Sequence, residues 1–269
     1  MKLGITTFVT DETAPPAELA AAIEERGFDA MFLAEHSHIP VSRQTPYPRG
    51  GDLPRGYYRA LDPFVSLTAA AAATSTLKLG TGIALLIQRD VIHTAKSVAS
   101  LDLVSGGRAL FGVAVGWNRE EMRNHGTDPR TRGALLDEQI QALRTIWTHE
   151  EAEFHGAHVD FDPIRQWPKP VGEVPVYIGG NSATALERAK RLGARWLPNA
   201  LTDPKAVAAQ VGQAGSVPVT ATSAAPDPAV LEAYAQAGAE RVTLALPASS
   251  PGDAWRRLDA LGALVSAFG

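Results

Sequence analysis

Two histidines stand beside an acidic side chain at the end of an apolar run, in the sequence Glu35-His36-Ser37-His38. An imidazole in such a place can move a proton, hydrogen-bond a ring-shaped ligand or bind a metal ion. A metal-dependent hydrolase would need further histidines and a late aspartate after later strands. The segments 179–181, 197–199 and 246–248 provide no such ligands, so this rival enzyme class is disfavoured and no metal site is expected. The structural alternative is that His36 only caps a strand.

A second set of polar groups, Gly116-Trp117-Asn118, follows the apolar run 109–115. Residues 98–104 before it have helical apolar spacing, and Gly106-Gly107 predicts where that helix ends. The apolar run itself predicts a strand that is buried on both faces. Because ligands in parallel α/β proteins bind at the carboxyl ends of the strands, Trp117 and Asn118 are candidate binding residues.

The turn Gly179-Gly180-Asn181 leads from the apolar run 174–178 into a helical segment that Ser182 is placed to cap. Unpaired backbone amides and the positive end of the helix dipole favour an anion at such a turn. The spacing is neither that of a dinucleotide fingerprint nor that of a Walker loop. Helix capping by Ser182 alone is the alternative explanation.

Two glycines, Gly80 and Gly82, interrupt the buried run 78–87. A glycine inside a strand indicates a bulge or a close approach between the backbone and a ligand. Packing against a neighbouring element explains the pattern equally well.

These motifs lie in a chain whose strand-like and helical runs alternate along its length, which predicts an α/β fold of repeated strand–helix units. The candidate strands are 2–8, 30–34, 78–83, 109–115, 174–178, 195–198, 217–222 and 241–246. The candidate helices are 16–26, 63–73, 92–104, 132–147, 182–192, 204–214, 228–236 and 252–267. About eight strands predict a closed (β/α)8 TIM barrel, with residues 1–269 as one domain.

Two segments interrupt this alternation. Residues 36–60, after the second strand, are too long and too rich in proline, glycine and arginine for an ordinary loop, which favours a lid over one mouth of the barrel. The alternative is a surface insertion. The segment holds one acidic residue, Asp52, and four arginines, Arg43, Arg49, Arg55 and Arg59. Residues 152–170 predict a hairpin or an extended arm before the fifth strand.

The composition is that of a soluble enzyme with a large core, because 45% of the residues are hydrophobic and 20% are charged. A formal net charge of -4 argues against a nucleic-acid partner, since phosphate contacts need a basic face. The chain has no cysteine, which excludes disulfides and thiolate metal sites. Its start, MKLGITTF, enters a strand-like run without a long apolar segment, so we expect a cytoplasmic protein without membrane contact.

Four motifs taken together resemble those of the bacterial luciferase-like family of flavin- and deazaflavin-dependent oxidoreductases. They are EHS at 35–37, TGI at 81–83, LDLVSGGR leading into GVAVGWN at 101–118, and PVYIGGNS at 175–182. The resemblance covers the chain from the first strand to the helix after the sixth. The sequence looks most like the short members that are taken to use coenzyme F420, although FMN users share much of the pattern.

The resemblance implies a role for each matched residue. His36 and its acidic neighbour Glu35 are expected to be catalytic, with His36 facing the cofactor ring or the substrate. Thr81, Gly82 and Ile83 match a bulge under the ring that holds a non-proline cis peptide, which we place at Gly82-Ile83. The other implied cofactor contacts are Arg108, Trp117, Asn118, Gly179, Gly180, Asn181 and Ser182, of which the last four form a phosphate turn.

The implied function is hydride transfer between C5 of F420 and a small organic substrate, and the lid arginines would suit the phosphate and oligoglutamate tail of F420. An FMN-dependent monooxygenase is the alternative enzyme, and a flavin-binding barrel without activity is the alternative of another class. Sugar-phosphate dehydrogenases of the family have a glutamate three residues before the asparagine, where this chain has Val115, so their reaction is disfavoured. Family members are commonly dimers, so a homodimer is expected.

Overall fold

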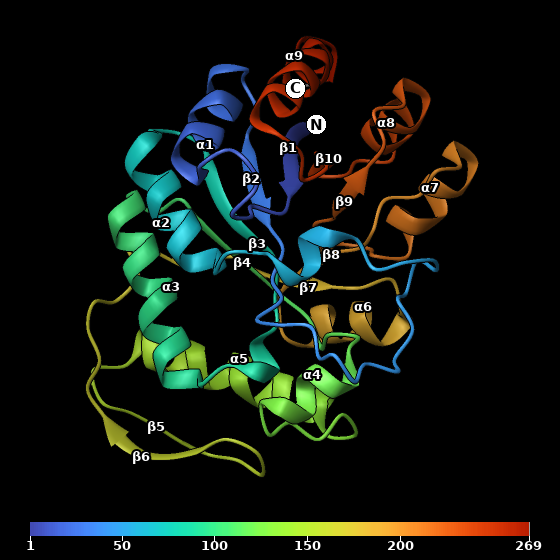
Figure 1. Cartoon of the computed structure of the whole chain (residues 1–269). Helices are drawn as coiled ribbons and strands as arrows, with labels where there is room; N and C mark the ends of the chain where they lie inside the picture. Colours follow the sequence, from blue (N-terminus) through green and yellow to red (C-terminus); the bar gives the residue numbers. More distant parts are fainter. Residues whose placement is uncertain (269) are drawn as a thin grey trace.

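Eight parallel strands form a barrel in the computed structural model, which describes residues 1–268 (Figure 1). They are β1 (Lys2–Thr7), β2 (Ala30–Leu33), β3 (Lys78–Ala84), β4 (Ala109–Val113), β7 (Val176–Gly179), β8 (Arg195–Leu197), β9 (Thr220–Ala224) and β10 (Arg241–Ala245). The strands pair in the order β8-β7-β4-β3-β2-β1-β10-β9, and single bridges from Trp196 to Val219 and from Asn199 to Thr222 join the two ends. The predicted α/β barrel is confirmed.

Helices cover the outside of the barrel (Figure 1). They are α1 (Pro16–Glu25), α2 (Pro63–Ala73), α3 (Val91–Ser105), α4 (Arg119–Asn124), α5 (Arg132–Thr148), α6 (Ala183–Arg191), α7 (Pro204–Gly212), α8 (Pro228–Gln236) and α9 (Pro251–Phe268). The sequence supplies side-chain caps for several of them, as at Asp62 before α2 and Asp90 before α3. Among the described helices, α4 alone was not predicted. No helix within residues 1–268 has both the length and the apolar character needed to cross a membrane.

A small apolar cluster fills the inside of the barrel, and its largest members are Phe32 and Tyr177. Their rings meet edge to face with 6.0 Å between centroids, which is a favourable aromatic geometry. Gly80 on β3 makes room for this cluster, because a Cβ atom there would lie 2.5 Å from Cδ1 of Phe32. Packing therefore explains the glycine at position 80.

Both predicted insertions are present. The lid, residues 36–60, contains a short 3-10 turn, η1 (Arg55–Tyr58), and several of its residues line a pocket at the barrel mouth. The arm is an antiparallel hairpin of β5 (Ala152–His155) and β6 (Asp160–Ile164). Glu138 of α5 holds the turn of this hairpin by accepting backbone hydrogen bonds, which anchors the arm to the barrel wall.

Gly112 on β4 has the closest packing of the described glycines. A Cβ atom there would lie 2.1 Å from the carbonyl oxygen of Thr81 on β3. The substitution Gly112→Ala must therefore push two paired strands apart, and we expect it to lower the free energy of unfolding by about 2–3 kcal/mol. Urea denaturation of the purified variant measures this change.

Gly252→Ala is the matched control, because Gly252 lies in α9 with no heavy atom within 4 Å of the added carbon. We expect that variant to match the wild type or to gain up to about 1 kcal/mol, since alanine restricts the unfolded chain. If both variants lost the same free energy of unfolding, close packing at Gly112 would not be the cause of the loss.

Candidate active site

A pocket of about 690 Å³ opens at the carboxyl end of the barrel strands. This volume lies within the range of about 300–1,000 Å³ that is usual for small-molecule and cofactor sites. The strand ends form one part of the wall, and the lid contributes the rest through residues such as Tyr47 and Tyr57. Most of the wall is apolar, with a few polar side chains that include His36.

His36 follows β2, lines the pocket and is only 8% exposed. Its Nδ1 atom lies 2.8 Å from Oε2 of Glu121, and its Nε2 atom lies 3.3 Å from the indole nitrogen of Trp117. A carboxylate accepts hydrogen bonds, whereas an indole N–H can only donate. These two partners place the proton on Nδ1 and a lone pair on Nε2 of His36.

Glu121 in α4 is fully buried. One carboxylate oxygen contacts His36, and the other accepts the backbone N–H of Ser37 at 3.2 Å. The carboxylate thus orients the imidazole and fixes the first residues of the lid. Glu121 is not predicted from the sequence, because a helix of six residues is too short to show apolar periodicity. The available signal was an acidic residue three positions after the capping residue Asn118.

The second histidine of the motif, His38, belongs to a polar network outside the pocket wall. The hydroxyl of Ser37 lies 2.9 Å from Nδ1 of His38 and 2.7 Å from Nε2 of His125, while Asn124 contacts the other nitrogen of His38. Burial and the neighbouring His38 lower the pKa of His125. Within residues 1–268, no three His, Cys, Asp or Glu side chains are grouped to hold a metal ion.

Glu35 lines the pocket, but its contacts are those of a positioning residue, whereas the resemblance implies a catalytic role. One oxygen accepts the backbone N–H of Leu85 at 2.6 Å, and the other accepts from Nε of Arg89 at 2.7 Å. Arg89 also pairs with Asp62 at 2.6 Å. Because both oxygens of Glu35 are engaged, this carboxylate fixes the connection between β3 and α3 beside the pocket.

Aromatic rings enclose His36 from the side of the lid. The ring centroid of His36 lies 5.1 Å from that of Tyr57 and 5.7 Å from that of Trp117. The hydroxyl groups of Tyr47 and Tyr57 lie 3.2 Å apart, and burial raises the pKa of Tyr57. The lid therefore presents an apolar, aromatic surface to the pocket.

The three residues of the predicted bulge divide between core and pocket. Thr81 is buried, and its hydroxyl donates to the carbonyl oxygen of Gly112 at 2.7 Å, so it supports strand pairing and lies behind the pocket wall. Gly82 and Ile83 line the pocket, and the peptide bond between them is cis, as predicted. The register between β3 and β4 shifts at this point, which confirms the bulge.

The glycine turn after β7 is divided in the same way. Gly179 and Gly180 line the pocket and bring backbone to its surface. Asn181 and Ser182 are exposed and lie outside the wall, where Asn181 accepts the backbone N–H of Asn199 at 2.7 Å. Ser182 caps α6, so the capping explanation holds for this residue, and an anion contact at the turn stays a prediction.

Trp117 lines the pocket, but Asn118 does not. The side-chain oxygen of Asn118 caps α4 by accepting the backbone N–H of Glu121 at 3.4 Å. Its amide nitrogen is buried and has no hydrogen-bond partner within residues 1–268. Asn118 therefore supports the helix that carries Glu121, whereas the resemblance implies a cofactor contact for this residue.

The structure does not bring Arg108 to the site. This arginine stands at the amino-terminal end of β4, away from the pocket, and is buried. Its guanidinium donates to four backbone carbonyl oxygens, those of Ala71, Thr74, Leu77 and Ser105. The expected cofactor contact is thus corrected to a structural role, because the donors that would hold a phosphate tie helix ends to the barrel.

Two of the four lid arginines, Arg55 and Arg59, are less free than their sequence context suggests. Arg55 donates to Glu12 at 2.7 Å, and Arg59 donates to Asp11 at 2.8 Å, both in the connection between β1 and α1. The hydrogen bond from Arg55 lowers the pKa of Glu12. Within the lid sequence only Asp52 opposes these arginines, but the fold adds two further carboxylates.

Three threonines from different strands form a cluster of hydroxyl groups at the pocket, which is not predicted from the sequence. The hydroxyl of Thr222 lies 3.0 Å from that of Thr6 and 3.1 Å from that of Thr243. Ser223 beside them also lines the pocket and has a φ of 61°, which is unusual for a residue other than glycine. These residues are far apart in sequence and meet only when the barrel closes.

Glycine backbone forms much of one side of the pocket, at Gly82, Gly116, Gly179 and Gly180. At Gly179 a Cβ atom would lie 2.8 Å from Cγ2 of Ile83, so no larger residue fits there without movement. A wall with so few side chains allows a flat ring to lie against the backbone. The volume and this wall together fit a flavin or deazaflavin ring.

Known proteins share both the sequence and the fold. A family model described as luciferase-like monooxygenase matches residues 6–216. An uncharacterized protein of Mycobacterium tuberculosis (strain ATCC 25618 / H37Rv) is 38% identical over 282 residues, which cover 99% of this chain and 99% of that protein. The F420-dependent glucose-6-phosphate dehydrogenase of Nakamurella multipartita is 30% identical over 179 residues, which cover 65% of this chain and 49% of that protein.

A solved structure, that of the monooxygenase RslO1 from Streptomyces bottropensis, matches the whole chain. The TM-score is 0.80 at 18% identity, and 100% of each chain is covered, so the likeness concerns the fold. The family model covers well over half of the sequence, and the motifs at the strand ends lie within it. The chain therefore belongs to the luciferase-like monooxygenase family, an oxidoreductase family with F420-dependent members.

Proposed function

We propose that the protein is an F420-dependent oxidoreductase that exchanges a hydride with a small organic substrate in the pocket at the barrel mouth. The observation that carries this proposal is the imidazole of His36, which lies at the pocket wall and is oriented by the buried carboxylate of Glu121. When bound, F420 supplies the hydride chemistry at C5 of its ring. The chain has to bind the ring, orient the substrate and move a proton.

His36 is placed to move that proton. Oxidation of an alcohol releases a hydroxyl proton, and reduction of a carbonyl group requires one. The lone pair on Nε2 accepts the proton in the first case and returns it in the second. Glu121 stabilises the charged imidazolium, because its carboxylate lies 2.8 Å from Nδ1. The indole of Trp117 holds Nε2 through a long contact of 3.3 Å, which a substrate oxygen can replace.

Five pocket residues would hold the cofactor ring, namely Gly82, Ile83, Trp117, Gly179 and Gly180. They offer flat backbone and apolar surface, which suits an aromatic ring system. The aromatic side chains of the lid exclude water from the same space, which protects a hydride donor from side reactions.

The pocket also favours a class of substrate. Val115 lines it at the position where sugar-phosphate dehydrogenases of the family have a glutamate. Together with Val115, the side chains of Tyr47 and Tyr57 give the pocket an apolar surface for a substrate to lie against. We therefore infer that ketones, imines or secondary alcohols with an apolar body are the substrates.

FMN-dependent monooxygenation is the second candidate, since a wall of glycine backbone accepts either ring and the fold matches that of the monooxygenase RslO1. A barrel that binds a flavin without turning over a substrate is a third. All three bind a ring in the pocket, but they differ in which cofactor binds and whether a substrate reacts.

Cofactor titration tests the proposal directly. We expect F420 to bind at micromolar concentration and FMN to bind at least about tenfold more weakly, which quenching of cofactor fluorescence measures. Tight FMN binding without F420 binding would favour the monooxygenase. Binding of neither cofactor would rule out both enzymes, and F420 binding without turnover of any ketone, imine or alcohol would favour the inactive barrel.

His36→Ala tests the proton-transfer role. Without the imidazole, we expect turnover of an active ketone or alcohol to fall at least about 100-fold, while the dissociation constant of F420 changes only a few-fold. His93→Ala is the control, since the His93 side chain is 92% exposed on α3 and outside the pocket. Unchanged turnover in His36→Ala would remove this residue from the mechanism.

Glu121→Gln tests how His36 is oriented. Wild-type Glu121 accepts from Nδ1 of His36 with one oxygen and from the backbone N–H of Ser37 with the other. Glutamine has a single acceptor oxygen, which can face only one of these two donors, and its amide nitrogen then faces the other. If the amide nitrogen faces His36, the imidazole proton moves to Nε2, and ¹⁵N chemical shifts of the ring report that tautomer. We expect this change together with reduced turnover.

The control for this substitution is Glu120→Gln on the same helix, because Glu120 accepts from Thr45 and does not contact His36. Its histidine spectrum should match that of the wild type. A wild-type spectrum for Glu121→Gln as well would show that Glu121 does not set the tautomer.

A further inference from the structure

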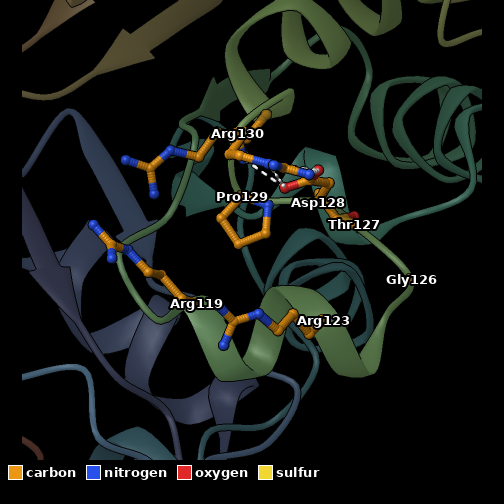
Figure 2. A pocket seen from close by; sticks show the side chains of 8 residues that line it. Arg119, Arg123, Gly126, Thr127, Asp128, Pro129 and Arg130 are labelled. Atoms are coloured by element: carbon orange, nitrogen blue, oxygen red, sulfur yellow. Dashed lines mark hydrogen bonds and ion pairs between the residues drawn. The ribbon is translucent and has the colours of Figure 1, made fainter.

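A second hollow, of about 730 Å³, lies over α4 and the loop that leads to α5. Figure 2 shows Arg119 and Arg123 on α4 and, across the hollow, Pro129 and Arg130 of the following loop. Arg132 at the start of α5 completes a set of four arginines around it. Among the described residues that line this hollow, Asp128 is the one charged side chain besides the four arginines.

This hollow adjoins the pocket through a third one, of about 610 Å³. The connecting hollow shares Arg119, Arg123 and Arg132 with the arginine-lined one. It shares Gly116 and Trp117 with the pocket that contains His36. We call the arginine-lined hollow and the connecting hollow together the arginine groove. The arginine groove therefore lies directly beside the pocket, on the side of Gly116 and Trp117.

Carboxylates compensate only part of the positive charge of the arginine groove. Arg130 pairs with Asp128 at 2.8 Å, and Arg123 lies 3.9 Å from Glu120. The carboxylate of Glu120 also accepts the hydroxyl of Thr45 at 2.6 Å, which divides its charge between two partners. With four arginines and these two carboxylates on its walls, the groove has an excess of two positive charges.

The excess resides on Arg119 and Arg132. Neither forms an ion pair with any residue in the described range 1–268. Nη1 of Arg132 donates to the sulfur atom of Met122 at 3.9 Å, a long contact with a weak acceptor that leaves the charge of the guanidinium uncompensated. The whole chain has a net charge of -4, and this local excess is therefore opposite to the overall charge.

We propose that the arginine groove binds a polyanionic chain, with phosphate or carboxylate groups, that continues from a ring-shaped ligand in the pocket. Guanidinium groups form paired, charge-assisted hydrogen bonds with both kinds of anion. The proposal rests on the proposed function for the identity of the ring. The tail of F420 is one source of such a chain, and an anionic substrate is the other.

The test compares ligands with and without the chain. Fluorescence titration gives the dissociation constants of F420 with its oligoglutamate tail and of the same deazaflavin without phosphate or glutamates. In R119Q/R132Q we expect the dissociation constant of the tail-free deazaflavin divided by that of F420 to fall at least about tenfold, and the salt dependence of F420 binding to weaken. The control is R256Q/R257Q, which removes the same charge from exposed positions on α9 and should keep the wild-type ratio.

A second measurement needs no cofactor. Tetraglutamate and tripolyphosphate are titrated at low ionic strength against the arginine Nε–H resonances of the wild type and of both double variants. One outcome is that the resonances of the wild type shift with the anions, those of R119Q/R132Q do not, and the two dissociation constants keep their wild-type ratio. This result would support anion binding in the arginine groove and assign the groove to an anionic substrate. No shifts and an unchanged ratio would overturn the proposal. If the wild type binds neither deazaflavin but both anions, the proposed function fails and the groove stands.

Discussion

The buried carboxylate of Glu121 is the constraint on which the site depends. A carboxylate without solvent is costly unless its oxygens are hydrogen-bonded or paired, and here His36 and the backbone of Ser37 provide those partners. The same contacts hold three separate pieces in one arrangement: the end of β2, helix α4 and the start of the lid. The charge that would stabilise a protonated imidazole is therefore also the charge that fixes where the imidazole lies.

A second carboxylate holds the end of β2 from the other side. Glu35 accepts from Leu85 and Arg89, so β2 is tied to β3 and α3, whereas Glu121 ties it to α4. His36 stands directly between residues held by both sets of bonds. The far part of the lid is held by ion pairs of the exposed Arg55 and the half-buried Arg59, and ion pairs at the surface contribute little to stability. Hydrogen bonds of buried carboxylates are thus concentrated around His36, the proposed proton-transfer group, and surface ion pairs at the cover of the pocket.

Sequence reasoning found the barrel, the lid, the arm and the pocket glycines, because strand alternation and glycine turns are local signals. It could not place Arg108 correctly, since a guanidinium suits a phosphate and a cluster of backbone carbonyls equally well. Only the position of Arg108 at the amino end of β4 decides between them. Glu121 and the threonines Thr6, Thr222 and Thr243 were missed for another reason: their partners are distant in sequence.

The chemistry of the walls separates ring recognition from cofactor discrimination. Glycine backbone and aromatic side chains bind a flat ring through shape and apolar contact, which F420 and FMN satisfy alike. The two cofactors differ beyond the ring, where one ends at a phosphate and the other continues as a chain of carboxylates. Asp11 and Glu12 compensate the charge of Arg55 and Arg59 in the lid, whereas no carboxylate in the described range 1–268 forms an ion pair with Arg119 or Arg132. The proposed discrimination by these two arginines would be electrostatic and would weaken with salt, while ring binding would depend little on ionic strength.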